Sequence, residues 1–584
     1  MPLCKAMAHN QMDLNIHNSL MCKLLRLGRY CQFWYVMLFG LLFIAVMWWS
    51  YNIGDTKSRE SLLPQHKDRV SILVNKTQTL KILEDLDLRP EEWDQIQRAV
   101  QWGGPDQEIT TVKMSTSPDH TTFVINNFKD SYYVGEELHV TIVAKDLTGR
   151  PKTYGGDFFK VKVYSAKLKA SVFGEVLDHH NGTYLARFTL PWVGEASVAV
   201  LLVHSSEAVQ IIKRHRETDP DRNIYYGYFV GKNSQGAIVE EKAACNVKWE
   251  GVALPGEEPC CCEYPDLKAK LTWLCRKPPT LPCNTLVYHG MGPYYVNHWT
   301  DLEKAIMNEQ YVERWIKGDS RAIRVLASNS TIGQREKCKP GMPTPIPAGF
   351  YMNDVWTSFV CATRHFNAAN DKTQCLKDKH IYMMGDSTLL QWYNFIINSV
   401  PNLRRMNLHT HSHNGPFLAV DVGNNIDLNY RTHGVPRRNP KATFTDMHYM
   451  SNEIDGMAGG PHTVIVFNIW AHFKLFPHSY FAHRVSQIRR AVVDLLRRAP
   501  ATKVIIKTAN SGLRNFGSVD WLSLQLDRIL REVFRDVGVY ILDVWQMNAC
   551  HYNKEEVHPG PVIIKNEVDI LLSFICPGFS LMIG

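Results

Sequence analysis

The sequence lacks internal repeats, low-complexity tracts and any strong excess of one charge. Its 65 Lys and Arg and 57 Asp and Glu give a formal charge of only +8 over 584 residues. The basic residues are spread along the chain, so we expect no nucleic-acid partner. Without a repeat period, solenoid and propeller architectures are excluded, and the length indicates a multi-domain protein.

The sequence also lacks the ligand patterns of a metal site. Cys260-Cys261-Cys262 has neither a Cys-x-x-Cys partner nor an accompanying histidine set, as a zinc site would need. Histidines alternate over 409–413, but no acidic or cysteine ligand stands near them, and we interpret them as a polar loop. We therefore expect no bound metal.

One apolar run is long enough to span a membrane. Residues 32–51 carry no charge, and about 20 such residues cross a bilayer. Three basic residues lie just upstream of the run: Lys23, Arg26 and Arg29. An aromatic end replaces the small-residue cleavage site of a signal peptide. We expect a single-pass type II signal anchor (32–53) with a cytosolic tail (1–31) in the Golgi or secretory-pathway membrane. A secreted, cleaved form is the alternative.

The cysteines and glycosylation acceptors agree with a luminal body. Eleven of the 14 cysteines follow the apolar run, and in an oxidising lumen they indicate a disulfide framework. The odd number predicts one free thiol or an intermolecular bridge. Three Asn-x-Ser/Thr acceptors also follow the run: Asn75, Asn181 and Asn329.

The luminal part divides into four regions. Residues 54–118 form a polar stem with one expected helix over 91–101. Short runs of alternating apolar and polar residues, separated by turn signals, predict an antiparallel β-sandwich of immunoglobulin or filamin type over 119–244. A cysteine-rich segment follows over 245–289. The remainder, 290–584, is long enough for one α/β domain.

Strands and helices alternate in this C-terminal region. The expected strands are 379–384, 463–468, 502–507 and 537–543, and the expected helices are 387–399, 479–498 and 519–536. Such alternation predicts a flavodoxin-like, mostly parallel sheet with helices on both faces. Catalytic loops of such sheets gather at the carboxyl ends of the strands.

Gly385-Asp386-Ser387 lies where an expected strand meets an expected helix. A serine there exposes its hydroxyl beside free backbone N–H groups. A serine nucleophile needs a base, and the base needs an orienting group. His558, before the last expected helix, is the candidate base. Glu555 or Asp543 is the candidate orienting acid.

Several sequence motifs of the C-terminal region resemble those of a known family. Gly-Asp-Ser opening an α/β segment and a His-Pro loop before a terminal helix resemble the SGNH/GDSL hydrolases. GPFLAVD, RRAVVDLLRR, KTAN, DVWQM and VIIKNEVDILLSFICP resemble its PC-esterase branch, and specifically the NXPE family, whose name joins neurexophilin with PC-esterase. The resemblance covers about 120–577.

The resemblance implies roles for four residues. Ser387 is the nucleophile and His558 the base, while Gly415 and Asn468 are expected to bind the oxyanion. The family's usual acid position holds Glu555 here, and the usual Gly-x-Asn-Asp block reads Phe467-Asn468-Ile469-Trp470.

The resemblance also implies a function. It favours O-acetyl transfer to, or ester hydrolysis from, hydroxyls of a glycan or glycoprotein through an acyl-serine. Sialic acid is the expected acceptor and acetyl-CoA the expected co-substrate, with no tightly bound cofactor. Arg431, Arg437 or Arg438 are candidates to engage an anionic sugar or cofactor phosphate. The alternative is a non-catalytic glycoprotein whose neurexophilin-like sandwich binds a cell-surface receptor.

Overall fold

The structure is a computed structural model. It describes residues 87–218, 225–252, 254, 260–292, 299–328, 335–410, 415–512, 519–553 and 555–577. All of them belong to one compact unit, 75–584. The expected cytosolic tail, the membrane anchor and the acceptors Asn75 and Asn329 lie outside these residues. Among the helices that are described, none is long and apolar enough to cross a membrane.

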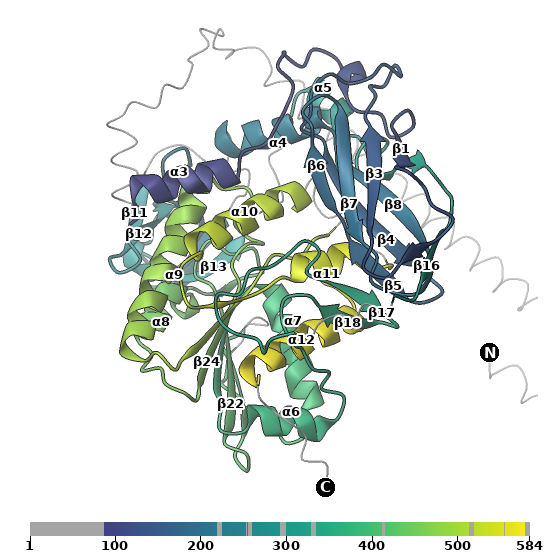
Figure 1. Cartoon of the computed structure of the whole chain (residues 1–584). Coiled ribbons are helices and arrows are strands. Elements are labelled where there is room, and N and C mark those ends of the chain that lie inside the picture. Colours follow the sequence, from purple (N-terminus) through teal and green to yellow (C-terminus); the bar gives the residue numbers. More distant parts are fainter. Residues whose placement is uncertain are drawn as a thin grey trace, which may run out of the picture. The chain divides into compact units, whose positions relative to one another are not determined.

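Two sheets pack face to face as a β-sandwich (Figure 1). The first sheet has five strands, in order β15 (Lys317–Gly318), β1 (Thr122–Ile125), β3 (Glu137–Val143), β7 (Thr183–Thr189) and β6 (Glu175–Asp178). The second has β18 (Val355–Ser358), β17 (Gly349–Met352), β5 (Ala170–Phe173), β4 (Phe158–Ser165), β8 (Gly194–His204), β16 (Ile323–Leu326) and β2 (Tyr132–Tyr133), with β14 (Arg314–Trp315) beside β8. Alternate residues face one shared core, as the period-two pattern predicted.

The expected domain boundary at residue 290 does not separate the sheets. Strands β14 to β18, at 314–358, all join the sandwich rather than the C-terminal domain. β16, for example, pairs with β8 and β2, which lie more than a hundred residues earlier. Pairing between such distant segments leaves no local sequence signal, so the boundary prediction was wrong here.

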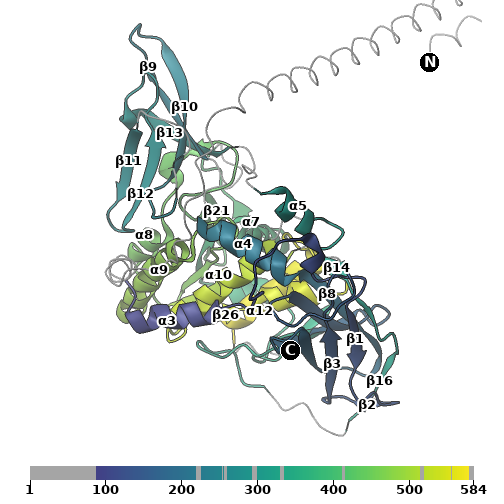
Figure 2. The same ribbon diagram turned by 90° about the horizontal axis from the view of Figure 1, so that it is seen from above.

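The cysteine-rich segment belongs to a separate six-stranded sheet, which lies apart from the sandwich strands in Figure 2. Its strands are, in order, β11 (Cys260–Asp266), β12 (Leu271–Arg276), β10 (Ile238–Val247), β9 (Tyr225–Lys232), β13 (Leu286–Met291) and β23 (Ala442–Thr443). Two helices connect it to the sandwich strands before and after it in the chain: α4 (Ser206–Thr218) and α5 (Asp301–Ile306).

The expected disulfide framework is present. The pairs are Cys245–Cys275, Cys260–Cys261, Cys262–Cys283, Cys338–Cys361 and Cys375–Cys576. The one remaining cysteine of the eleven that follow the apolar run, Cys550, is a buried free thiol.

The C-terminal region forms a seven-stranded sheet. In order, its strands are β20 (Arg404–Arg405), β21 (Phe417–Asp421), β22 (Ile426–Thr432), β19 (His380–Gly385), β24 (Thr463–Phe467), β25 (Lys503–Lys507) and β26 (Tyr540–Leu542). The five strands from β22 to β26 in this order are parallel. Numbered along the chain, they read 2-1-3-4-5, the order of one common doubly wound sheet.

Helices cover both faces of this sheet (Figure 1). One face carries α6 (Ala369–Leu376), α7 (Ser387–Ser399) and α12 (Pro561–Ile575). The other carries α8 (Met450–Asp455), α9 (His478–Arg498) and α10 (Val519–Val533), on which α3 (Pro90–Ala99) packs. A short helix, α11 (Val544–Cys550), follows β26. The chain reverses its strand order between β22 and β24, so the carboxyl end of β19 lies at the switch point where such folds bind ligands.

Candidate active site

Ser387 lies at the switch point, as the first residue of α7. β19 ends at Gly385, and Asp386 caps the helix: its Oδ1 accepts hydrogen bonds from the Thr388 N–H (2.9 Å) and hydroxyl (2.7 Å). In the part of the chain that the structure describes, the Ser387 N–H has no acceptor. A helix N-terminus therefore presents a free donor beside the partly exposed hydroxyl of Ser387.

The Asn468 side chain hydrogen-bonds to the turn between β19 and α7 that carries Ser387. Its Oδ1 accepts from the Asp386 N–H at 2.9 Å, and its Nδ2 donates to Asp386 Oδ1 and Thr388 Oγ1, both at 2.9 Å. The side chain is fully buried, and both amide hydrogens are used. Asn468 therefore fixes the turn and has no donor left for an oxyanion, in contrast to the expectation from the resemblance.

The charge of Asp386 is stabilised inside the protein. Burial acts to raise its pKa, but the charge of the nearby Lys507, together with hydrogen bonds from Asn468 and Thr388, lowers the pKa below its ordinary value. An ionised Asp386 is a stronger acceptor for the amides of the turn.

His558 lies beside Ser387, as expected. Its Nε2 is 2.8 Å from Ser387 Oγ, although the two residues are 171 positions apart. The loop that carries His558 is held on both sides. Gln391 of α7 donates to the Pro559 carbonyl at 3.2 Å, and Asn548 of α11 donates to the Glu556 carbonyl at 2.9 Å. The imidazole can take the hydroxyl proton at this distance.

The structure places the two candidate acids with other partners. Glu555 is buried, forms an ion pair with Lys160 and accepts a hydrogen bond from the Ser511 hydroxyl at 3.0 Å. Asp543 caps α11 and forms an ion pair with Arg531 at 3.0 Å. Within the described ranges, neither carboxylate hydrogen-bonds to His558. The expectation that one of them orients the imidazole is not met, because each carboxylate is committed to a cation.

Lys160 reaches this region from the sandwich. It lies on β4, and its Nζ forms ion pairs with both Glu555 and Asp520 of α10, all three side chains being almost fully buried. The Gly512 N–H also donates to Asp520 at 2.6 Å. Burial raises the pKa of Asp520 to about 6. The loop before His558 is thus tied to the other domain by a buried ion triad, which sequence reasoning missed.

A pair of histidines also lies at the carboxyl edge. His433 Nδ1 is 2.7 Å from the Gly434 carbonyl, and His433 Nε2 is 2.7 Å from His472 Nδ1. Burial lowers the pKa of His472 to about 4 and that of His433 far below its ordinary value, so both rings are neutral. A carbonyl only accepts, so His433 donates from Nδ1 and accepts at Nε2. His472 then donates from Nδ1 and keeps an unprotonated Nε2.

Several cationic side chains lie in the loops that come after β22 and β24. Arg437 donates to Thr432 at 2.7 Å, and burial lowers its pKa to about 10. Burial likewise lowers the pKa of Lys474 to about 8. Of the expected arginines, Arg431 lies 3.5 Å from Glu453 and is engaged there. The loops after β22 and β24 therefore give this edge a positive character.

Gly415 lies close to the turn. It is buried, has a φ of +88°, and contacts Tyr430, whose hydroxyl donates to the Asp386 carbonyl at 3.0 Å. Its role in the oxyanion hole stays a prediction. The acceptor Asn181 is exposed between β6 and β7, with Thr183 donating to its side-chain oxygen at 2.7 Å.

These observations define a protein in which a β-sandwich and a parallel α/β domain share a buried boundary, with a Ser–His pair at the carboxyl end of the α/β sheet. Residues 356–576 match the family model described as NXPE family member 4-like, C-terminal domain, and residues 107–301 match neurexophilin. The chain belongs to the NXPE family.

A solved structure that matches is the Escherichia coli adhesin FdeC, which its title describes as eliciting protection against urinary tract infections. It is 14% identical, and the match covers 36% of this chain and 66% of that chain, with a TM-score of 0.13.

Proposed function

We propose that the chain is a serine-dependent O-acyltransferase or esterase that acts on glycan hydroxyls. The observation that carries the proposal is the 2.8 Å contact between Ser387 Oγ and His558 Nε2 at the helix N-terminus. The resemblance to the PC-esterase branch of the SGNH hydrolases supports the same chemistry.

The reaction has two halves. His558 Nε2 takes the proton of Ser387 while Oγ attacks the acyl carbonyl carbon, and the departing group, a thiol if the donor is acetyl-CoA, leaves with that proton. His558 then takes a proton from a sugar hydroxyl, whose oxygen attacks the acyl-serine and releases Ser387. With water in place of the sugar, the same steps give ester hydrolysis. The Ser387 N–H, and the Gly415 N–H as a second candidate, stabilise the negative oxygen.

The site works as a Ser–His dyad in this proposal. Hydrogen bonds from Gln391 and Asn548 to the loop carbonyls position the imidazole, while Glu555 holds the loop to Lys160. Arg437 and Lys474 supply positive charge along the strand ends, which favours an anionic acceptor such as sialic acid.

We further propose that the protein works in the Golgi or another part of the secretory pathway, anchored as a type II membrane protein, with secretion as the alternative. Five disulfides and an exposed glycosylation acceptor, Asn181, support an oxidising compartment.

A direct test follows acyl groups on cell-surface glycans. Cells that express the wild type should gain O-acetyl groups on sialoglycans by mass spectrometry, whereas Ser387→Ala and His558→Ala should give the background level. Ser399→Ala, at the other end of the same helix, is the matched control and should behave as the wild type. If the wild type changes no glycan class, the enzyme proposal fails.

The second candidate function is receptor binding. It is favoured by the neurexophilin match over 107–301. In that case Ser387→Ala would leave every activity of the protein intact, and a cell-surface receptor would be captured equally by the wild type and the variant.

A further inference from the structure

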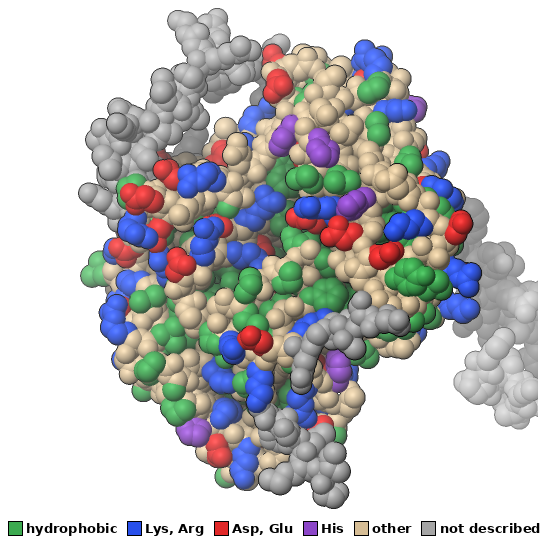
Figure 3. Space-filling model, in the orientation of Figure 1, with side chains coloured by type: hydrophobic (Ala, Val, Ile, Leu, Met, Phe, Trp, Pro, Cys, Tyr) green, Lys and Arg blue, Asp and Glu red, His purple; other side chains and the backbone are tan. Residues whose placement is uncertain are grey.

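A cavity of about 480 Å³ lies between the sandwich and helices α10 and α11. Figure 3 shows this face hollowed near those elements, with hydrophobic and charged side chains around the hollow. Neither Ser387 nor His558 lines the cavity. Small-molecule sites have volumes of about 300–1,000 Å³ and favour domain boundaries, so the size and the position both suit a ligand.

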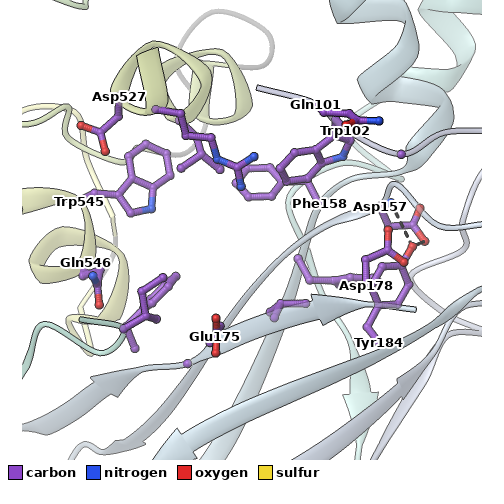
Figure 4. Close-up of a pocket in the computed structure, with 18 of the residues that line it drawn as sticks. Gln101, Trp102, Asp157, Phe158, Glu175, Asp178, Tyr184, Asp527, Trp545 and Gln546 are labelled. Atoms are coloured by element: carbon purple, nitrogen blue, oxygen red, sulfur yellow. Dashed lines mark hydrogen bonds between the residues drawn. The ribbon is translucent and has the colours of Figure 1, made fainter. Parts of the chain in front are cut away.

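Aromatic side chains form two walls of the cavity. Trp545 of α11 stands on one side, and Trp102 and Phe158 stand together on the other (Figure 4). Trp102 and Phe158 meet edge to face with ring centres 5.7 Å apart, and the Arg528 guanidinium lies 5.0 Å from the Trp102 ring. Such rings offer flat apolar faces against which the C–H face of a sugar can stack.

Polar groups complete the lining. Asp527 is buried and its Oδ2 accepts from Arg531 at 2.7 Å, so its charge is compensated within the wall of the cavity. Glu175 lies on the sandwich side, where its side chain is 40% exposed (Figure 4). Carboxylates accept hydrogen bonds from hydroxyls, and Arg528 can donate to them.

The charge of the lining decides the class of ligand. Arg531 is shared by Asp527 and Asp543, at 2.7 and 3.0 Å, so its charge is already compensated. Carboxylates outnumber guanidinium groups in the lining, and an anion is therefore disfavoured. This is the opposite of the positive edge around Ser387.

We propose that this cavity binds a neutral saccharide unit, stacked on Trp545 and hydrogen-bonded by Glu175 and Arg528. The proposal stands without the catalytic one, because the cavity is separate from Ser387. The two sites are connected through Lys160, whose Nζ lies 5.8 Å from the centre of the Trp545 ring and forms the ion pair with Glu555, three residues before His558.

Saturation-transfer NMR on the full-length protein tests the proposal. The probes are the methyl glycosides of galactose, mannose and N-acetylglucosamine, with glucuronate as the charged counterpart. At least one neutral glycoside should bind more tightly than glucuronate. Trp545→Leu and Arg528→Met should each weaken that binding by about tenfold or more. Two variants are used because Trp545 is buried and its loss can affect folding, whereas Arg528 is only partly buried.

Two control variants show whether the glycoside binds in the cavity itself. Trp315→Leu removes a tryptophan that is 53% exposed and lies elsewhere, so binding should be unchanged. Ser387→Ala should bind the glycoside as the wild type does, even if acyl transfer is lost or never observed. Absence of binding by every neutral glycoside, tighter binding of glucuronate, or undiminished binding by folded Arg528→Met would overturn the proposal.

Discussion

Replacing Lys160 with methionine leaves two buried carboxylates without the cation that they share. The side chains of Lys160, Asp520 and Glu555 are 4%, 1% and 3% exposed, so water cannot replace the lost charge. Removing one partner of a buried ion pair costs about 3–5 kcal/mol. We expect the free energy of unfolding to fall by that amount near neutral pH.

The loss should depend on pH in a defined direction. With Lys160 present, burial already raises the pKa of Asp520 from 3.8 to about 6. A carboxyl with a raised pKa in the folded state binds more protons there than in the unfolded state, so its contribution to stability falls as the pH rises from about 4 to 6. Without Lys160 the pKa rises further. Lowering the pH from about 7.5 to about 5 should therefore restore part of the lost stability.

Urea unfolding followed by tryptophan fluorescence measures both effects. The matched control is Lys248→Met, which removes an exposed ion pair with Glu263 (2.8 Å, side chains 55% and 50% exposed) and should cost about 0–1 kcal/mol. Adding Asp520→Asn and Glu555→Gln to Lys160→Met should recover most of the loss, since no buried charge is left unpaired. Equal stability of Lys160→Met and wild type, or an equal loss at both pH values, would refute the reasoning.

Three other predictions concern the site and the fold. Glu555→Gln should keep acyl transfer within about tenfold of the wild type, because that carboxylate holds the loop and not the imidazole; a loss of about 10⁴-fold would restore it as the triad acid. Gly385→Ala should abolish activity and lower stability by about 1–3 kcal/mol, because the added Cβ would lie 1.8 Å from Asn468 Oδ1; an active variant of unchanged melting temperature would contradict this. Replacing Cys375 and Cys576 together with serine opens a loop of 201 residues and should cost up to about 5 kcal/mol by chain entropy, and an unchanged urea midpoint would argue against it.

The sequence alone was enough to predict the local elements of the C-terminal domain. The expected strand, turn and helix around Ser387 appear as β19 and α7, with Asp386 as the cap. The position of His558 beside Ser387 was also predicted, because a serine nucleophile needs a base and the family resemblance implies His558 in that role. Such features depend on periodicity, caps and strand order, which a short stretch of sequence encodes.

The tertiary structure decided the partners of the polar side chains. Spacing along the chain favoured Glu555 as the orienting acid, but Lys160, 395 positions away, takes its charge. Asn468 was expected to face the substrate, and a Cβ-free Gly385 instead lets it hydrogen-bond behind the turn.

Contacts between residues far apart in the chain also account for the features that the sequence did not indicate. Strands at 314–358 joined the sandwich, and His433 met His472, because residues far apart in the chain came together during folding. A carboxylate or an imidazole binds whichever charge or donor lies within about 3 Å, and only the packing of the two domains sets that distance.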